Sequence, residues 1–107
     1  MKVDLTQIEP NEIMPGFRGR FVHLEQYTQA YWEISAGSEL PEHSHVNEQT
    51  SQVIEGEFEM TIGGETNVFK PGMIAKIDSN VVHSGKALTD CKIIDVFAPM
   101  RPEYTNS

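Results

Sequence analysis

Three histidines in this chain have the spacing and the neighbours to bind a metal ion. His43 and His45 are separated by one residue in "PEHSHVNEQ", and His83 lies in "SNVVHSG". Residues i and i+2 of a strand point to the same face, so His43 and His45 can aim two imidazoles at one point. Neutral imidazole binds several divalent transition metals. The pair alone is a weak signal, because two exposed strand residues have the same spacing.

Two possible oxygen ligands follow the pair side by side, Glu48 and Gln49. On a strand without a bulge, Gln49 has the odd parity of both histidines and faces the same way, whereas Glu48 faces the opposite way. In a small barrel, the distant third histidine comes close to them. Three imidazoles and one oxygen leave one or two positions on an ion for water or substrate. The predicted metal ligands are His43, His45, Gln49 and His83.

The composition argues against several classes of function. The chain has 107 residues and a formal net charge of −8 without a basic patch, which argues against binding to nucleic acid or to an anionic membrane. An anionic ligand would need a local positive site. The single cysteine, Cys91, excludes an intrachain disulfide. No apolar run approaches the roughly 20 residues that span a bilayer, and the N-terminus lacks an apolar h-region, so a cytoplasmic protein is expected.

Short strands separated by turns are expected to position these residues. In "EFEMTI" apolar and polar residues alternate, and Gly63–Gly64 then predicts a tight hairpin turn. Other predicted strands are "RFVHLEQYT" and "AYWEIS", parted at Thr28 and Gln29, then "MIAKI", "VVH" and "CKIIDVF". Recurring turns and the lack of a long helix predict an all-β sandwich or barrel. One domain is expected over 1–107, with an irregular N-terminal arm (1–16), a barrel (17–98) and a C-terminal extension (99–107).

The histidine motif resembles that of the cupins, a superfamily of small jelly-roll barrels, also described as double-stranded β-helices. Their first motif, G-x5-H-x-H-x3,4-E-x6-G, is matched from Gly37 to Gly56, with Gln49 at the acidic position. The glycine register therefore agrees with strand parity in choosing Gln49 over Glu48. All four ligands are then neutral, and a divalent ion keeps its full charge, which suits anionic or vicinal-oxygen ligands.

The second cupin motif, G-x5-P-x-G-x2-H-x3-N, is matched in part. It begins at Gly72 and has His83 at the histidine position. The proline, the second glycine and the asparagine are replaced by Asp78, Asn80 and Ala87. The metal-binding histidines are thus all present, whereas the residues that shape the turns are partly lost.

The C-terminal sequence "DVFAPMR" adds a narrower resemblance. Asp95 and Phe97 share one strand face, and Arg101 follows four residues later. Asp95 lies in an apolar run, where a carboxylate needs a partner or a role. This ending, together with glutamine at the metal, is similar to the small cupins of uronate catabolism. Those proteins convert cyclic 4,5-unsaturated uronates from pectin or alginate to their linear keto form.

The resemblance implies a role for each residue. One divalent ion (Ni, Zn, Fe or Mn) would be held by the three histidines and the glutamine, and would polarise sugar oxygens. Asp95 would move protons as a general acid and base, Arg101 would bind the uronate carboxylate and take part in catalysis, and Phe97 would form a wall of the pocket. These roles favour an enzyme that acts on small anionic or oxygen-rich substrates. Cupins of this size are commonly dimers, so a homodimer is expected.

Two other functions stay open at this point. A cupin dioxygenase or lyase acting on another small acid would use the same barrel and metal. A non-catalytic cupin that senses small acids would bind its ligand without turnover.

Other conspicuous residues have ordinary interpretations. His23 has no second ligand at metal spacing and is interpreted as a solvated or hydrogen-bonded strand histidine. Arg18 and Arg20 are interpreted as surface cations, with a positive rim as the alternative. Tyr31 and Trp32 point to opposite faces, so that one packs in the core and the other lines the pocket or an interface.

Overall fold

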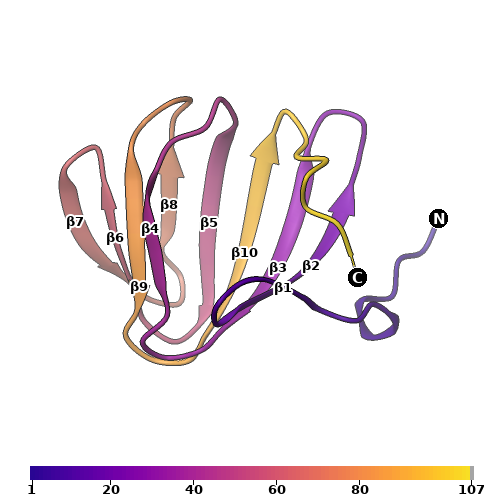
Figure 1. Cartoon of the computed structure of the whole chain (residues 1–107), viewed down its shortest axis with the longest axis horizontal. Helices are drawn as coiled ribbons and strands as arrows, with labels where there is room; N and C mark the ends of the chain where they lie inside the picture. The colour runs from indigo at the N-terminus through magenta and orange to yellow at the C-terminus, as the bar shows by residue number, and fades with distance from the viewer. Residues whose placement is uncertain (107) are drawn as a thin grey trace.

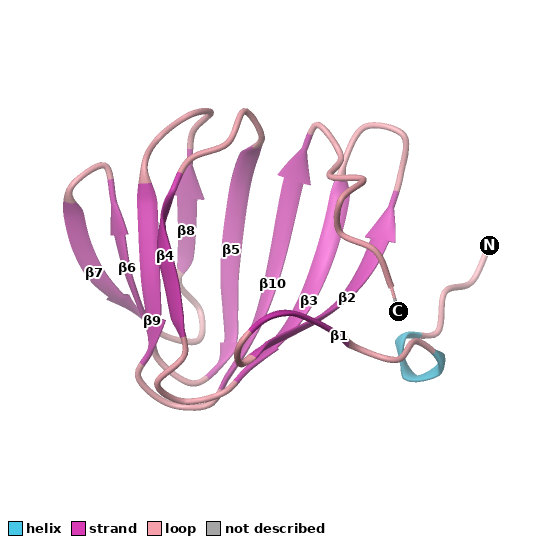
Figure 2. Ribbon diagram, viewed as in Figure 1, coloured by secondary structure: helices cyan, strands magenta, loops and turns pink. Residues whose placement is uncertain are grey.

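Two antiparallel β-sheets face each other in the computed structural model, which describes residues 1–106 (Figures 1 and 2). The six-stranded sheet has the order β1 (Asn11–Met14), β2 (Phe17–His23), β3 (Thr28–Ile34), β10 (Cys91–Ala98), β5 (Glu48–Glu55) and β8 (Ile74–Ile77). The four-stranded sheet has the order β4 (Glu39–His43), β9 (His83–Ala87), β6 (Phe58–Ile62) and β7 (Glu65–Phe69). The prediction of an all-β jelly-roll barrel is confirmed.

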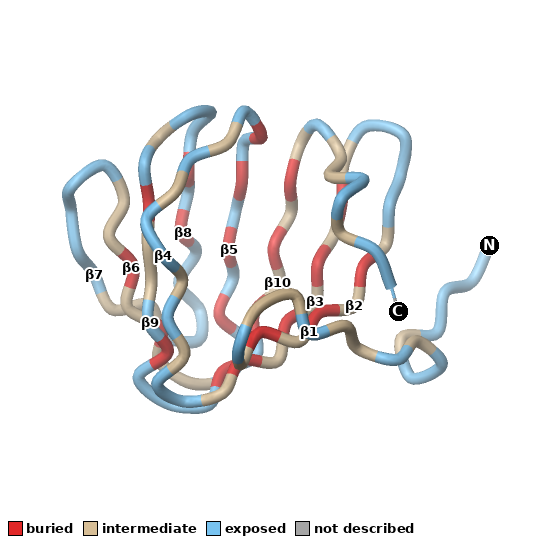
Figure 3. The backbone as a smooth tube through the Cα atoms, viewed as in Figure 1, coloured by how far each residue is buried: buried red, intermediate tan, exposed pale blue. Residues whose placement is uncertain are grey.

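Alternating burial explains how the two sheets pack. Every second residue of β3 from Thr28 to Ile34 is buried, and β10 buries its odd-numbered residues. Phe17 of β2 meets Trp32 of the same sheet and Phe58 of the facing sheet edge-on, with ring centroids 6.2 and 6.5 Å apart, so its contact with Phe58 joins the layers. Figure 3 shows the buried positions spaced along the strands, whereas most loops are exposed.

The buried polar residues gather at one end of the sandwich. They are Thr28, Asn47, Gln49, Ser51, His83 and Asp95. The strand register accounts for much of this cluster, because Asp95 of β10 is opposite Ser51 of β5, and Phe97 is opposite Gln49. Farther along the same pair of strands, Ile93 is opposite Val53. The interior is therefore apolar at one end and polar at the other.

The N-terminal region differs from expectation in two places. Residues 1–16 are not wholly irregular, because 3-10 helix η1 (Leu5–Gln7) forms there and β1 pairs with β2. Gly16, at φ 82°, permits the turn between these strands. The expected break at Thr28 and Gln29 is wrong, because both residues belong to β3. The turn lies at residues 24–27, where Leu24 N–H donates to the Tyr27 carbonyl, and β-branched Thr28 fits the strand opposite Phe97.

Other local expectations agree with the structure. Gly63 and Gly64 form the turn between β6 and β7 with φ values of 56° and 85°, as a tight Gly-Gly hairpin predicts. The only helix among residues 1–106 is η1, and it is too short to cross a membrane. Ser107, the last residue of the predicted C-terminal extension, lies outside the described residues.

Candidate metal centre

Three histidines converge at the polar end of the sandwich. His43 ends β4, and His83 begins β9 directly opposite it. His45 follows in the loop between β4 and β5. One ring nitrogen of each lies within 4.8 Å of those of the other two. The convergence thus arises from strand pairing and a loop, not from two histidines on one strand as expected.

Backbone carbonyls determine which nitrogen of each ring carries hydrogen. In every ring Nδ1 lies 2.8–2.9 Å from a carbonyl oxygen two residues away, that of Pro41, Asn47 or Val81. A carbonyl only accepts, so Nδ1 must donate, and Nε2 of the neutral ring keeps its lone pair. Metal-binding histidines commonly have this arrangement, in which the outer hydrogen bond fixes the tautomer and the ring orientation.

In two of these rings Nε2, which carries the lone pair, has no hydrogen-bond donor to accept from. Nε2 of His83 is buried and has no hydrogen bond within residues 1–106. Nε2 of His45 lies 3.1 Å from Oε1 of Gln49, whose Nε2 donates to Ser51 Oγ at 2.9 Å. Two acceptors that face each other at this distance are unfavourable unless a proton or a cation is shared between them. The donor set, three imidazoles and a neutral amide oxygen, therefore fits a divalent transition metal.

Glu48 and Gln49 point to opposite faces of β5, as their parity predicts. Gln49 is 7% exposed, whereas Glu48 is exposed to solvent. The charge of Glu48 therefore lies outside the barrel, and the group beside the histidines is a neutral amide.

Burial keeps the histidines in the form that binds metal. Burial lowers the pKa of His83, and burial together with the nearby Arg101 guanidinium lowers the pKa of His45. Only the neutral imidazole has a lone pair for an ion, so these shifts favour metal binding at neutral pH.

Asn80 preserves the turn that the second motif would make with glycine. It is the only non-glycine residue within 1–106 at positive φ, at 63°, a conformation that asparagine tolerates better than most residues. Its N–H donates to the His45 carbonyl at 2.8 Å, and Ser79 Oγ donates to the Val46 carbonyl at 2.7 Å. The turn before β9 therefore braces the loop that carries His45.

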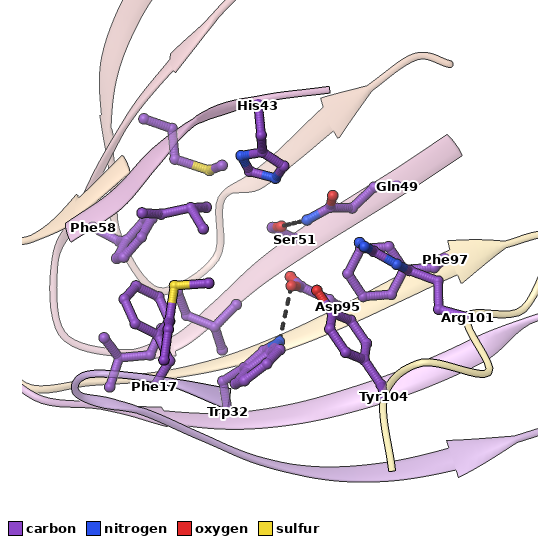
Figure 4. Close-up of a pocket in the computed structure, with 15 residues that line it drawn as sticks. Phe17, Trp32, His43, Gln49, Ser51, Phe58, Asp95, Phe97, Arg101 and Tyr104 are labelled. Atoms are coloured by element: carbon purple, nitrogen blue, oxygen red, sulfur yellow. Dashed lines mark hydrogen bonds between the residues drawn. The ribbon is translucent and has the colours of Figure 1, made fainter. Parts of the chain in front are cut away.

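Asp95 faces the same cavity from β10 (Figure 4). Trp32 Nε1–H donates to its Oδ2 at 3.0 Å, whereas Oδ1 is buried without a partner among the described residues. Burial raises the pKa of Asp95 to about 6, against the lowering effects of Ser51, Trp32, Gln49 and Arg101. Near neutral pH both protonation states are accessible, as a general acid and base requires.

Arg101 enters the cavity from the segment after β10. Its guanidinium carbon lies 4.9 Å from the Phe97 ring centroid and 4.4 Å from that of Tyr104, within the range of cation–π attraction. Its Nε donates to Glu103 Oε2 at 2.9 Å. Figure 4 shows the guanidinium beside Phe97, on the side of the cavity that also holds Gln49.

Most of the residues predicted from sequence meet at one cavity of about 40 Å³. His43, Gln49, Asp95, Phe97 and Arg101 line it directly. The other two predicted ligands adjoin it, since the rings of His45 and His83 have centroids 5.5 and 4.2 Å from that of His43. The far end of the cavity is apolar, lined by residues that include Phe17, Phe58 and Met60.

Some cavity residues were not identified from the sequence. Ser51 shares the parity of Gln49, which would have been a usable signal. The sequence left open which of Tyr31 and Trp32 faces inward; it is Trp32, which is buried and lines the cavity. Tyr104 follows the last strand in an irregular segment, where hydrophobic periodicity does not predict which side chains face the cavity. Among the positively charged residues, Arg18 bonds to Ser35 and Arg20 to the Ile8 carbonyl; neither lines the cavity.

His23 lies outside the cluster of three histidines. Its Nδ1 is 2.8 Å from Thr28 Oγ1, and its Nε2 is 2.6 Å from the Tyr104 carbonyl oxygen. Both ring nitrogens are occupied, which agrees with the interpretation of a hydrogen-bonded strand histidine.

Comparison with known proteins adds the family. The family described as Cupin domain matches residues 30–97. An RmlC-like cupin from Shewanella frigidimarina NCIMB 400 is 26% identical, over 94% of this chain and 91% of its own, with a TM-score of 0.89. KdgF from Halomonas sp. is 24% identical, over 92% of each chain, with a TM-score of 0.87. Ectoine synthase from P. lautus is 23% identical, over 94% of this chain and 79% of its own, with a TM-score of 0.84. No curated protein matches the sequence significantly.

The family match covers more than half of the chain and includes all three clustered histidines, His43, His45 and His83. The two-sheet jelly roll and the histidine cluster at one end of it agree with that match. The chain therefore belongs to the cupin family.

Proposed function

We propose that this protein is a metal-dependent enzyme that converts cyclic 4,5-unsaturated uronates to their linear keto form. The observation that carries the proposal is the convergence at one cavity of neutral metal-binding groups, a buried carboxyl group with an unpartnered oxygen, and an arginine. Neutral ligands leave the charge of a divalent ion uncompensated. Together with Arg101, that charge would attract a sugar carboxylate to a protein whose net charge is −8.

The ion would be held by the three clustered histidines and Gln49. When bound, it would supply Lewis-acid polarisation of sugar oxygens. Arg101 would bind the uronate carboxylate through its terminal Nη groups, since Glu103 occupies Nε. Phe97 packs against the arginine and would limit how the sugar ring can turn.

The reaction is an isomerisation that requires two proton transfers. Removal of the proton from the anomeric hydroxyl lets the bond between C1 and the ring oxygen break, which leaves an aldehyde at C1 and an enolate at C5. Delivery of a proton to C4 converts the enolate to a ketone. Asp95 can serve both steps through Oδ1, because Trp32 holds Oδ2 and a pKa of about 6 makes both protonation states accessible.

The test is direct. Metal-loaded protein is incubated with a panel of 4,5-unsaturated monouronates, and the loss of the enol absorbance is followed against buffer. We expect Asp95→Asn to keep its metal and lose about 10²–10⁴-fold in turnover, and His43→Ala to lose both metal and turnover. No acceleration by the wild-type protein with any member of the panel rejects the proposal.

Measurements of oxygen uptake and of ligand binding, made beside this assay, separate the other two functions. Iron-dependent oxygen uptake with a small acid, without enol loss, would indicate a dioxygenase. Tight binding of a uronate without turnover would indicate a sensor.

A further inference from the structure

The last described residues form a strap, residues 99–106, which folds back across β3 and β2 (Figure 1). Its far end is fastened to β2 by Asn106. Phe21 N–H donates to Asn106 Oδ1 at 2.9 Å, and Asn106 Nδ2 donates to the Phe21 carbonyl at 3.0 Å. Asn11 Nδ2 also donates to the Thr105 carbonyl at 2.8 Å. The side-chain amide of Asn106 thus serves as hydrogen-bond partner for both backbone groups of Phe21, in the place of a neighbouring strand.

The near end of the strap is fastened through Thr28 and His23. The Arg101 backbone N–H donates to Thr28 Oγ1 at 2.8 Å, and the Tyr104 carbonyl oxygen lies 2.6 Å from His23 Nε2. A carbonyl only accepts, so His23 donates from Nε2, and in the neutral ring Nδ1 accepts the Thr28 hydroxyl proton at 2.8 Å. One relay therefore links both ends of the segment 101–104 to β2 and β3.

Tyr104 fills the gap between this relay and the core. Its ring stacks on Phe21, with centroids 5.0 Å apart and planes 19° apart, and meets Trp32 and Phe97 edge-on at 5.7 and 5.6 Å. These contacts place the tyrosine ring on one side of Arg101, with Phe97 also in contact with the guanidinium. The side chain of Arg101 is only 13% exposed, so its position depends on the strap.

We propose that the strap is the element that positions Arg101 to bind an anion, and that Thr28 and His23 are positioning residues acting through it. Only the identity of the anion, a uronate carboxylate, rests on the proposed function. The relay fixes the backbone of residue 101, the two aromatic rings fix the plane of its guanidinium, and Glu103 on Nε leaves the Nη end for a carboxylate. Binding through a preorganised arginine loses less side-chain entropy than binding through a mobile one.

Thr28→Val is the sharpest variant, because valine keeps the shape of this fully buried side chain and removes only the hydroxyl. Thr28→Ser is its matched control and keeps the hydroxyl. Binding of D-galacturonate to the metal-loaded protein is measured by calorimetry. We expect Thr28→Val to weaken binding about 3- to 10-fold, Thr28→Ser to restore most of it, and metal content to be unchanged in both. In an Arg101→Ala background, Thr28→Val should have no further effect on binding.

A second pair of measurements follows the strap itself. Trp32 is the only tryptophan in the chain, so its emission reports on the contact with Tyr104. We expect Thr28→Val and Asn106→Ala to change this emission and to speed hydrogen exchange in residues 101–106. If the strap loosens while galacturonate affinity stays at the wild-type value, or if Thr28→Val weakens binding equally without Arg101, the positioning role is overturned. It is also overturned if the wild type shows no Arg101-dependent binding of galacturonate.

Turnover separates this inference from the proposed function. If the wild type shows no uronate turnover yet binds galacturonate in a manner that depends on Thr28 and Arg101, the strap inference stands and the proposed reaction fails. If turnover is found, we expect Thr28→Val to raise KM by about the same 3- to 10-fold and to leave kcat within about twofold, because the strap acts on binding. Turnover with an unchanged KM in Thr28→Val would overturn the strap inference alone.

Discussion

His83 at the metal centre and His23 beneath the strap are hydrogen-bonded in opposite ways. The Nδ1 of His83 faces a carbonyl, and its buried Nε2 has no partner within residues 1–106. In His23 it is Nε2 that faces a carbonyl, and Nδ1 is occupied by a hydroxyl. A ring with one orphaned nitrogen has a lone pair for an ion, whereas a ring with two satisfied nitrogens has none. The hydrogen bonds therefore support the division that sequence spacing predicted, with His83 as a candidate ligand and His23 as a structural histidine.

The two regions also differ in what they contribute to stability. A buried polar atom without a partner costs about 1–3 kcal/mol, which applies to His83 Nε2 in the candidate metal centre and which a bound ion would relieve. Every polar group in the relay from Arg101 N–H to the Tyr104 carbonyl is satisfied within the chain. The candidate metal centre thus has polar atoms left for a group from outside the chain, whereas the hydrogen-bonding groups of the strap relay are paired with one another.

The largest expected effect is on metal content. His83→Ala removes one of three imidazoles, so we expect metal affinity to fall by at least about a hundredfold, beyond the range for loss of an outer hydrogen bond. His23→Ala is the matched control and should keep one ion per chain. The measurement is elemental analysis of protein purified without chelator. Equal metal loss in both variants would show that the hydrogen-bond distinction between these histidines is wrong.

The next effect concerns Asp95 in metal-free protein. Its pKa is raised from 3.8 to about 6 on folding, so the folded state holds this proton more tightly. The resulting stability is fully present below pH 4 and is lost as pH rises through about 6, a total of up to about 3 kcal/mol. Asp95→Asn has no carboxyl group at this position, so its stability lacks this pH-dependent contribution. From pH 4 to 7, its free energy of unfolding should therefore rise relative to wild type by up to that amount.

Urea unfolding of both proteins across this range gives the difference. The lowered pKa values of His45 and His83 act in the opposite direction, because they make both proteins less stable as pH falls, and they cancel in the comparison. A difference that does not vary with pH would mean that Asp95 is ionised in the folded state throughout. Metal should shrink the difference, because a nearby cation favours the carboxylate.

The strands and the ligand parity were predictable because they depend on local periodicity. Glu48 and Gln49 occupy opposite faces of β5 as alternation requires, and the Gly63–Gly64 turn forms where two adjacent glycines permit it. The bond from Trp32 to Asp95 was not predictable, because it joins residues 63 apart and depends on the pairing of β3 with β10. A strand pattern says which face a residue occupies, not which residue lies across from it.

The strap was also beyond prediction from sequence. It has no periodicity, and its hydrogen bonds run through the side chains of Asn106, Thr28 and His23 and join residues 73–85 positions apart. The break expected at Thr28 shows the same limit, since a residue that reads as a turn former serves there as the acceptor for Arg101. Local propensity carries no information on such tertiary partners.

A smaller effect tests whether the neutral oxygen belongs to the metal centre. Gln49→Ala should reduce metal affinity about 10-fold, because three imidazoles remain, and Glu48→Ala should change it by less than about twofold. Titration of metal-free protein with zinc measures both. Gln49→Glu is informative in the other direction, since a carboxylate should tighten the metal and weaken galacturonate by partly neutralising the ion. Equal effects of the alanine variants would place the fourth ligand elsewhere.

The smallest expected effect is that of Tyr104→Leu on anion binding. Leucine keeps an apolar contact with Phe21 and removes the ring over the Arg101 guanidinium, so the loss is one cation–π contact, worth about 0.5–1 kcal/mol at a partly exposed site. Galacturonate affinity should fall about 2- to 5-fold, with metal content unchanged. Tyr104→Phe keeps the ring and should bind as wild type does. If the leucine and phenylalanine variants bind alike, the ring does not hold Arg101, and the backbone relay through Thr28 positions the arginine alone.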